Sequence, residues 1–196
     1  MKQTIAKEQR TEAILFTLKK LGYASRTQLQ RIHRLGGDRN ANRVLTEMRE
    51  YLCSVRLEEN VYYLNAEGRE RVGCQRVLKK TGQVTHYLMR NALFIAFGCP
   101  ASWRSEVKLE VSGEAKVIAD ALFSRENRYY ICEIDNTQKM AANRDKIARY
   151  RRMVELGVFK QAPAFVWLTT TEYRRQELAK LCEGLCVKIY TASELR

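Results

Sequence analysis

The sequence predicts an α/β (α+β) fold in two parts, a helical N-terminal domain that ends in a β-hairpin and a C-terminal mixed sheet flanked by helices. Apolar residues recur at helical spacing through the N-terminal part, whereas farther on short strand-like runs alternate with helical segments. The 196 residues are 45% hydrophobic and 9% aromatic, which is enough apolar material for packed cores. We place the two domains at residues 1–78 and 79–196.

Three short helices are expected in the N-terminal domain. The first carries a periodic apolar face and ends at Gly22, because glycine readily adopts the left-handed conformation that closes a helix. Ser25 is expected to cap a second helix, and Asp38 a third helix over residues 39–52. A glycine turn between the second and third helices completes a helix-turn-helix pattern.

A hairpin after the third helix distinguishes a winged helix-turn-helix from a plain helical bundle. Residues 54–57 and 61–64 are strand-like and flank the acidic turn Glu58-Glu59-Asn60. We expect the third helix to enter a major groove of DNA, because arginine and asparagine bond base edges and phosphates. The expected DNA-binding residues of this domain are Arg39, Asn40, Asn42, Arg43 and Arg49. The alternative is a dimerisation or docking module, because an acidic wing is a poor partner for phosphate.

The charge balance favours a polyanionic partner. The chain carries 35 Lys and Arg against 22 Asp and Glu, a formal net charge of +13, and its sequence pI is about 9.6. Basic side chains placed on phosphates release counterions and thereby add affinity. The alternative is a basic surface that serves solubility or a ribosome-like environment alone.

Compartment and zinc content follow from what the sequence lacks. No apolar run approaches the roughly 18 residues that span a bilayer, and the first residues are too polar for a secretory signal. We therefore expect a cytoplasmic protein that makes no membrane contact. The cysteines form no Cys-x-x-Cys pair, and the two histidines, His33 and His86, lie far apart, so no zinc site is expected.

The C-terminal domain is expected to follow the order helix, three strands, helix, strand, helix, strand. The expected helices cover residues 81–97, 139–156 and 171–182, and the expected strands cover 103–107, 116–123, 129–134, 163–168 and 186–190. Ile147, Tyr150 and Met153 are the expected core positions of the middle helix. This order predicts a mixed sheet flanked by helices.

Three carboxylates interrupt the apolar strands of this domain. Asp120 lies within one strand, and Glu133 and Asp135 lie two residues apart in the next, so their side chains point to one side of the sheet. Burying several carboxylates together is costly unless a cation or strong hydrogen-bond donors compensate, and hard oxygen ligands suit Mg²⁺ or Mn²⁺. Such a site supports phosphodiester cleavage. The alternative is that these acids face solvent, helix N-termini or neighbouring arginines.

Several short sequence motifs, taken in their order along the chain, make it resemble the plasmid replication-relaxation family, which overlaps the MobC type of mobilisation relaxase. These motifs are His86 with Asn91, residues 103–106, residues 118–122, residues 130–137 and residues 146–150. The resemblance implies a winged helix followed by a domain with the PD-(D/E)xK fold of restriction endonucleases. It therefore implies a restriction-endonuclease-like mixed sheet after the winged helix-turn-helix.

The resemblance also implies roles for individual residues. Asp120 matches the first nuclease acid and Glu133 the second, and Glu106 is an additional candidate ligand. The implied metal ligands are Glu106, Asp120, Glu133 and Asp135, and the implied catalytic residues are Asp120, Glu133, Asp135 and Lys146.

The chain departs from the nuclease motif at two positions. Asp135 stands where the motif has lysine, so the usual ammonium is absent unless Lys146 or Lys139 from the next helix replaces it. Ala119 replaces the motif's proline, which shapes the backbone and takes no part in the chemistry.

The helix expected at 139–156 is rich in basic residues. We expect this helix to run along the phosphate backbone of DNA and to contact it through Lys139, Arg144, Lys146, Arg149, Arg151 and Arg152. The alternative is that these residues form a solvated helix face. A tyrosine nucleophile is a second way to cleave DNA, and the candidates are Tyr87, Tyr129, Tyr130 and Tyr150. Aromatic core packing is the alternative role for each of them.

Three functional hypotheses remain from the sequence. The leading one is a plasmid or mobile-element protein that binds double-stranded DNA and nicks it at an origin-like site with a divalent metal. The second is a non-catalytic DNA-binding accessory protein or regulator with a degenerate nuclease-like domain, and the third is a repressor with an α/β effector domain. The partners are then plasmid origin DNA, a second copy of the chain, or another mobilisation or replication protein.

Overall fold

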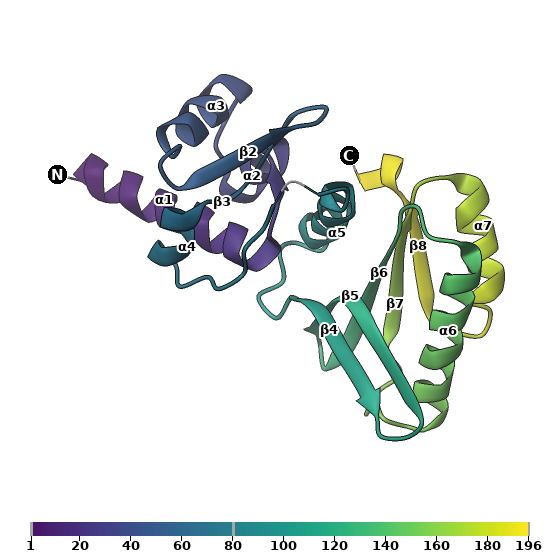
Figure 1. Ribbon diagram of the computed structural model, residues 1–196. Helices are drawn as coiled ribbons and strands as arrows, with labels where there is room; N and C mark the ends of the chain where they lie inside the picture. Colours follow the sequence, from purple (N-terminus) through teal and green to yellow (C-terminus); the bar gives the residue numbers. More distant parts are fainter. Residues whose placement is uncertain (1, 80, 196) are drawn as a thin grey trace. The chain divides into compact units, whose positions relative to one another are not determined.

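The computed structural model describes residues 2–79 and 81–195, and the chain divides into two compact units, 1–91 and 92–196 (Figure 1). The sequence placed the domain boundary at 78/79, whereas the packing divides the chain within helix α5 (Val84–Ala96). The first half of α5 packs in the N-terminal unit, where Arg90 Nη2 donates to the Leu21 carbonyl at 2.9 Å and Asn91 Nδ2 to the Tyr23 carbonyl at 2.5 Å.

The N-terminal unit begins with the two helices that the sequence predicts. Helix α1 (Lys2–Leu21) ends at Gly22, whose φ of +86° confirms the predicted cap. Helix α2 (Arg26–His33) is capped by Ser25, whose Oγ accepts from the Gln28 amide at 3.2 Å. The Gln28 side chain in turn accepts from the Ser25 amide at 3.3 Å, so both partners of a capping box are present.

Helix α3 (Asp38–Glu47) is shorter than predicted, and Asp38 is its first residue rather than its cap. The Asp38 carboxylate pairs instead with Arg26 Nη1 at 2.6 Å, and the cap position, Gly37, makes no side-chain cap hydrogen bond. After Glu47 the chain turns and enters a strand at Leu52. The prediction failed here because the apolar residues after Glu47 suit helical and strand spacing equally.

A three-stranded antiparallel sheet with the order β1-β3-β2 completes the N-terminal unit. Strands β2 (Leu52–Arg56) and β3 (Asn60–Leu64) confirm the predicted hairpin, which we call the wing. Strand β1 (Ala24–Ser25) has too few residues to show a periodic pattern. Helix α4 (Ala66–Arg71) follows, and a Cβ at its Gly68 would lie 2.2 Å from the Tyr51 carbonyl oxygen, so only glycine fits there.

The C-terminal unit is a five-stranded mixed sheet with the order β4-β5-β6-β7-β8. Its strands are β4 (Arg104–Val111), β5 (Ala115–Arg125), β6 (Arg128–Asp135), β7 (Ala164–Thr169) and β8 (Val187–Thr191). Strands β4, β5 and β6 pair antiparallel, and β6, β7 and β8 pair parallel. With its helices the unit confirms the α+β class and the predicted order of elements.

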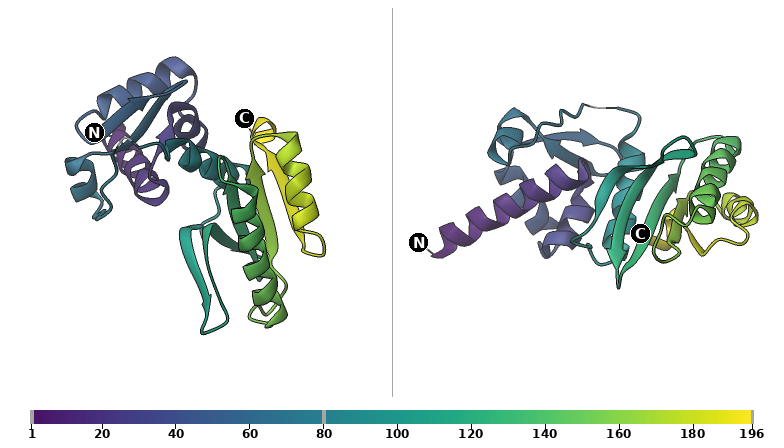
Figure 2. Two further views of the ribbon diagram at one scale, coloured as in Figure 1. Left: turned by 45° about the vertical axis from the view of Figure 1, so that its right-hand side comes forward. Right: turned by 90° about the horizontal axis from the view of Figure 1, so that it is seen from below.

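Helices α6 (Met140–Glu155) and α7 (Glu172–Leu181) cover one face of this sheet, on the same side in both views of Figure 2. The predicted core positions Ile147, Tyr150 and Met153 are buried there, against Phe165 and Trp167 of β7. A short 3-10 helix, η1 (Ala192–Leu195), follows β8. Among the helices of residues 2–79 and 81–195, none combines the length and apolar character needed to cross a bilayer.

The sheet separates between β5 and β6, and this separation positions the candidate site. The ladder between them joins Ala121–Arg125 of β5 to Arg128–Cys132 of β6. Residues 115–119 extend beyond that ladder while they remain paired with β4. Side chains of α6 therefore lie next to a stretch of β5 that has left its inner neighbour.

Candidate functional site

Glu133 is the centre of the candidate site in the C-terminal unit. It lies on β6, its side chain is 0% exposed, and it faces α6. Its Oε2 accepts a hydrogen bond from Lys146 Nζ, and its Oε1 accepts one from the Tyr150 hydroxyl. Both donors come from α6, one turn apart, so a single helix holds both oxygens of the carboxylate.

Asp120 lies on β5 beside Glu133, at the position where the strand ladder stops. Its Oδ2 accepts from the backbone amide of Ile134 at 2.7 Å, so a side chain takes over where backbone pairing with β6 ends. The charge of Asp120 is close enough to Glu133 to change its titration. We call Asp120, Glu133 and Lys146 the acid–lysine cluster.

Burial dominates the electrostatics of this cluster. Loss of solvation raises the pKa of Glu133 well above its ordinary value, the charge of Asp120 raises it further, and Lys146 and Tyr150 only partly oppose this rise. Burial likewise raises the pKa of Tyr150 well above its ordinary value, with Glu133 as the next cause. Glu133 therefore holds a proton to higher pH than a solvated glutamate does.

Asp135 faces the same side of the sheet as Glu133, as predicted, but its surroundings differ. It accepts from Arg174 through Nε at 2.7 Å and Nη2 at 2.6 Å, from Thr169 Oγ1 at 2.7 Å and from Asn143 Nδ2 at 2.8 Å. Burial alone would raise the pKa of Asp135, but hydrogen bonds from Arg174, Thr169 and Asn143 outweigh it and lower that pKa. Asp135 therefore joins the end of β6 to α6, α7 and β7.

Glu106 lies on β4 and its side chain is exposed. In the strand register it stands opposite Asp120, between the pairs Ser105–Ala121 and Val107–Ala119. Its φ of +55° is a left-handed conformation that is unusual for a residue with a side chain. Within the described residues, no group of three or more His, Cys, Asp and Glu side chains is arranged to hold a metal ion.

The structure therefore brings together some of the predicted site residues and separates others. Asp120, Glu133 and Lys146 meet, and Asp135 binds Arg174 instead, whereas Glu106 is exposed on β4 at the position opposite Asp120. Arg174, which follows Asp135 by 39 positions, and Asn143 are partners of Asp135 that no pattern in the sequence predicted. The only sequence signal for Arg174 is its place in the first turn of a predicted helix.

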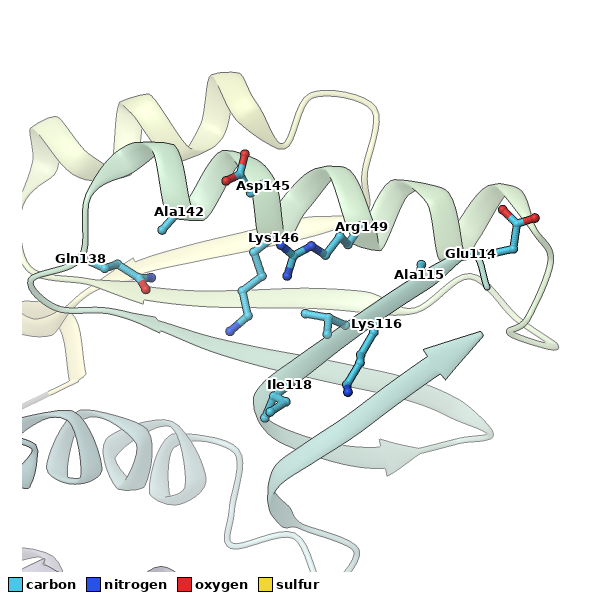
Figure 3. Close-up of a pocket in the computed structure, with 10 residues that line it drawn as sticks. Glu114, Ala115, Lys116, Ile118, Gln138, Ala142, Asp145, Lys146 and Arg149 are labelled. Atoms are coloured by element: carbon cyan, nitrogen blue, oxygen red, sulfur yellow. The ribbon is translucent and has the colours of Figure 1, made fainter. Parts of the chain in front are cut away.

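A groove of about 700 Å³ adjoins the cluster between β5 and α6 (Figure 3). We call it the β5–α6 groove. It is lined by Glu114, Ala115, Lys116, Val117, Ile118, Gln138, Ala142, Asp145, Lys146 and Arg149. Lys146 thus contacts Glu133 on one side and the groove on the other.

Some basic residues of α6 bond to other parts of the protein, and others are exposed on its surface. Arg151 donates to the Leu181 carbonyl at 2.9 Å, and Arg152 Nη2 lies 2.5 Å from Glu114 Oε2. Arg144 and Arg149 are exposed, and of these two Arg149 lines the groove. Lys139 occupies the N-cap position of the helix.

The predicted DNA-binding residues of the N-terminal unit all lie on the exposed side of α3 or just after it. Ala41, Val44 and Leu45 form the buried side, and the exposed residues are Arg39, Asn40, Asn42, Arg43 and Arg49. Asn40 Nδ2 donates to the Leu35 carbonyl at 2.7 Å and so fixes the turn before α3. Arg43 Nη2 donates to Asn40 Oδ1 at 2.8 Å, and Arg43 also pairs with Glu47.

The tip of the wing folds back onto α2. The Glu59 carboxylate accepts from the Thr27 amide at 3.0 Å and the Thr27 hydroxyl at 2.8 Å, and it lies 3.5 Å from Arg26 Nε. One of the two acidic charges at the tip is therefore partly neutralised by α2. This weakens the electrostatic argument against DNA binding that the sequence raised.

A second hollow, of about 460 Å³, lies at the turn between α2 and α3. It is lined by Thr27, Gln30, Arg31, Arg34, Gly36 and Asp38. Arg31 and Arg34 are not among the residues selected from the sequence, and they lie in the last turn of α2 and at its C-cap. Their position next to α3 adds two cations to that surface.

Comparisons with known proteins place the chain in a family. No curated protein matches it. Among solved structures it is similar to protein VC1899 from Vibrio cholerae, with a TM-score of 0.44 and 13% identity, over 94% of this chain and 48% of that one. The chain thus spans about half the length of that protein.

A family model matches most of the chain. Residues 15–167 match the model of the replication-relaxation family. The protein therefore belongs to the replication-relaxation family.

Proposed function

We propose that the protein acts in plasmid replication or mobilisation, binds double-stranded DNA through a winged helix-turn-helix in its N-terminal unit, and nicks DNA at the acid–lysine cluster. Membership of the replication-relaxation family supports the role in replication. The net charge of +13 and the exposed arginines of α3 support DNA as the partner. The order of elements in the C-terminal unit supports a PD-(D/E)xK-like domain.

The observation that carries the nicking proposal is the contact between Lys146 and Glu133. The nuclease motif requires a lysine near its two acids, and in this sequence the expected position holds Asp135. Lys146 supplies an ammonium from α6 at the second acid, beside Asp120. The charge set of such a nuclease site, two carboxylates and one ammonium, is therefore present although its sequence order differs.

The two carboxylates also fit a divalent cation. Mg²⁺ commonly takes one or two carboxylates and completes its coordination with water and substrate phosphate oxygens, so a third protein acid is not needed. Asp120 and Glu133 would hold Mg²⁺ or Mn²⁺, and the cation would polarise the phosphate and the attacking water. Burial first, and then the nearby charge of Asp120, raise the pKa of Glu133, and a bound cation would stabilise the charged form of both carboxylates.

The residues of this chain have separate tasks in the proposed reaction. Lys146 lines the groove, where its ammonium stabilises negative charge that develops on a phosphate. Tyr150 donates to Glu133 and orients it, and because Tyr150 is 0% exposed it cannot itself attack a phosphate. Tyr150 is thereby excluded from the four tyrosine candidates, and we propose water, activated at the cluster, as the nucleophile.

Nicking of supercoiled plasmid that carries the element's own origin tests this proposal. Wild-type protein is expected to relax the plasmid with Mg²⁺ or Mn²⁺ and to lose this activity in EDTA. The variant Asp120→Ala/Glu133→Ala is expected to bind the plasmid without nicking it. Tight binding without nicking by the wild type under all metal conditions would contradict the enzymatic proposal.

That outcome would support the second candidate, a non-catalytic DNA-binding accessory protein. One observation favours it: each of the two buried acids of β6 has protein donors on both of its oxygens. An internally compensated polar network of this kind also serves as a scaffold that holds α6 and α7 on the sheet.

DNA binding through α3 is tested separately. Arg39→Ala/Arg43→Ala is expected to weaken binding to origin duplex and to reduce the salt dependence of log K by about 1 for each phosphate that the variant no longer binds. Fluorescence anisotropy over a range of salt concentrations measures both quantities. Lys180→Ala, which removes an exposed charge paired with Glu177 on α7, is the control and is expected to change neither. Equal affinity of the double variant and the control would rule out α3 as the DNA-binding element.

A further inference from the structure

The β5–α6 groove exists because residues 115–119 of β5 leave the sheet on the side of β6. One wall is this stretch of β5, and the other is the exposed side of α6. Figure 3 shows Lys146 and Arg149 extending from α6 toward β5, which carries Lys116 and Ile118. The groove therefore leads directly to the acid–lysine cluster.

The charges in the groove favour an anion. Of its acidic lining residues, Glu114 is paired with Arg152 at 2.5 Å. Lys116 and Arg149 are exposed and add positive charge on opposite walls, and Asp145 is the remaining acid of the lining. Two exposed cations that line one groove from different elements suit the phosphates of a chain that runs along it.

An exposed apolar side chain lies among these cations. Ile118 is 55% exposed and stands on the same strand as Lys116, two positions along, so both point to one side of β5. An apolar side chain next to phosphate-binding groups offers contact to the face of a nucleobase. In a duplex that face is stacked and hidden, whereas in a single strand it is accessible.

We propose that the β5–α6 groove binds a single-stranded segment of DNA, with phosphates on Lys116 and Arg149 and a base against Ile118. This proposal rests on the proposed function, because it assigns the strand that the acid–lysine cluster cleaves. A volume of about 700 Å³ is that of a small-ligand site and accommodates a few nucleotides of a single strand. The N-terminal unit then binds duplex while the C-terminal unit takes an unpaired strand.

The test uses the full chain with Arg39→Ala/Arg43→Ala as background, so that binding through α3 is reduced. The probes are an oligothymidine of about 12 nucleotides, within the usual site size for single strands, and a duplex of the same length. Adding Lys116→Gln/Arg149→Gln is expected to weaken oligothymidine binding about tenfold and to reduce its salt slope by about 1.4, or 0.7 per bound phosphate. Duplex binding is expected to stay unchanged.

Two further variants make the outcome specific. Ile118→Ala is expected to weaken oligothymidine binding at an unchanged salt slope, because it removes an apolar side chain and no charge. Lys180→Gln is the control for loss of one exposed cation and is expected to have no effect. Unchanged oligothymidine affinity in the groove variants, or equal losses on oligothymidine and duplex, would overturn the proposal. Persistent plasmid nicking by those variants would show that the proposed function survives that result.

Discussion

Replacement of Lys146 by methionine is expected to lower the rate of plasmid nicking by about 10²-fold or more, the usual contribution of a positioned proton-transfer or charge-stabilising group. Methionine keeps much of the aliphatic length and removes the ammonium that contacts Glu133 and lines the groove. Single-turnover nicking of origin plasmid at saturating protein measures the chemical step apart from DNA binding. We expect plasmid affinity to change far less than the rate.

Lys139→Met is the matched control for this substitution. Lys139 occupies the N-cap position of the same helix and is the other lysine that the sequence offers for the missing role. Its replacement is expected to leave the nicking rate within a few-fold of wild type. Equal losses in the two variants would show that Lys146 acts only as one of several basic residues on α6.

Arg174→Met is expected to lower the free energy of unfolding of the C-terminal unit by about 3–5 kcal/mol, because it leaves the carboxylate of Asp135 buried without its cation. Asp135 is 0% exposed, and Arg174 supplies two of its hydrogen bonds. Both tryptophans of the chain, Trp103 and Trp167, lie in this unit, so tryptophan fluorescence in a denaturant titration follows its unfolding.

The free energy of unfolding that Arg174→Met removes is expected to depend on pH in one direction. The folded protein lowers the pKa of Asp135, so the stability gained from it is present above the pKa of the unfolded chain and disappears as the pH falls through the folded value. The difference between wild type and Arg174→Met is therefore expected to be largest near neutral pH and to shrink in acid. Arg175→Met removes a surface arginine paired with Glu172 and Glu194 and is expected to cost about 1 kcal/mol or less. Similar losses in the two variants would contradict a special role for the Asp135–Arg174 pair.

Much of the fold follows from local patterns in the sequence. Short alternating or continuously apolar runs identify β4 to β8, and the two-residue spacing of Glu133 and Asp135 places them on one side of β6 because side chains alternate along a strand. The caps at Gly22 and Ser25 follow from residue chemistry at helix ends. These features depend on neighbouring residues only.

The environment of each acid depends on distant residues and could not be predicted in the same way. Glu133 and Asp135 have the same spacing pattern, yet one contacts a lysine and a tyrosine of α6 and the other an arginine of α7. The choice is set by how α6 and α7 pack across the sheet. The position of Glu59 against Thr27 similarly depends on the wing folding back over α2.

The two carboxylates of β6 divide two electrostatic tasks between them. The pKa of Asp135 is lowered and that of Glu133 is raised, although only one residue separates them. Asp135 is thus an anion near neutral pH, whereas Glu133 holds a proton more readily than a solvated glutamate. The carboxylate that joins the two helices to the sheet is therefore not the one whose partner, Lys146, lines the groove, so support of the frame and the charge beside the groove fall on different side chains.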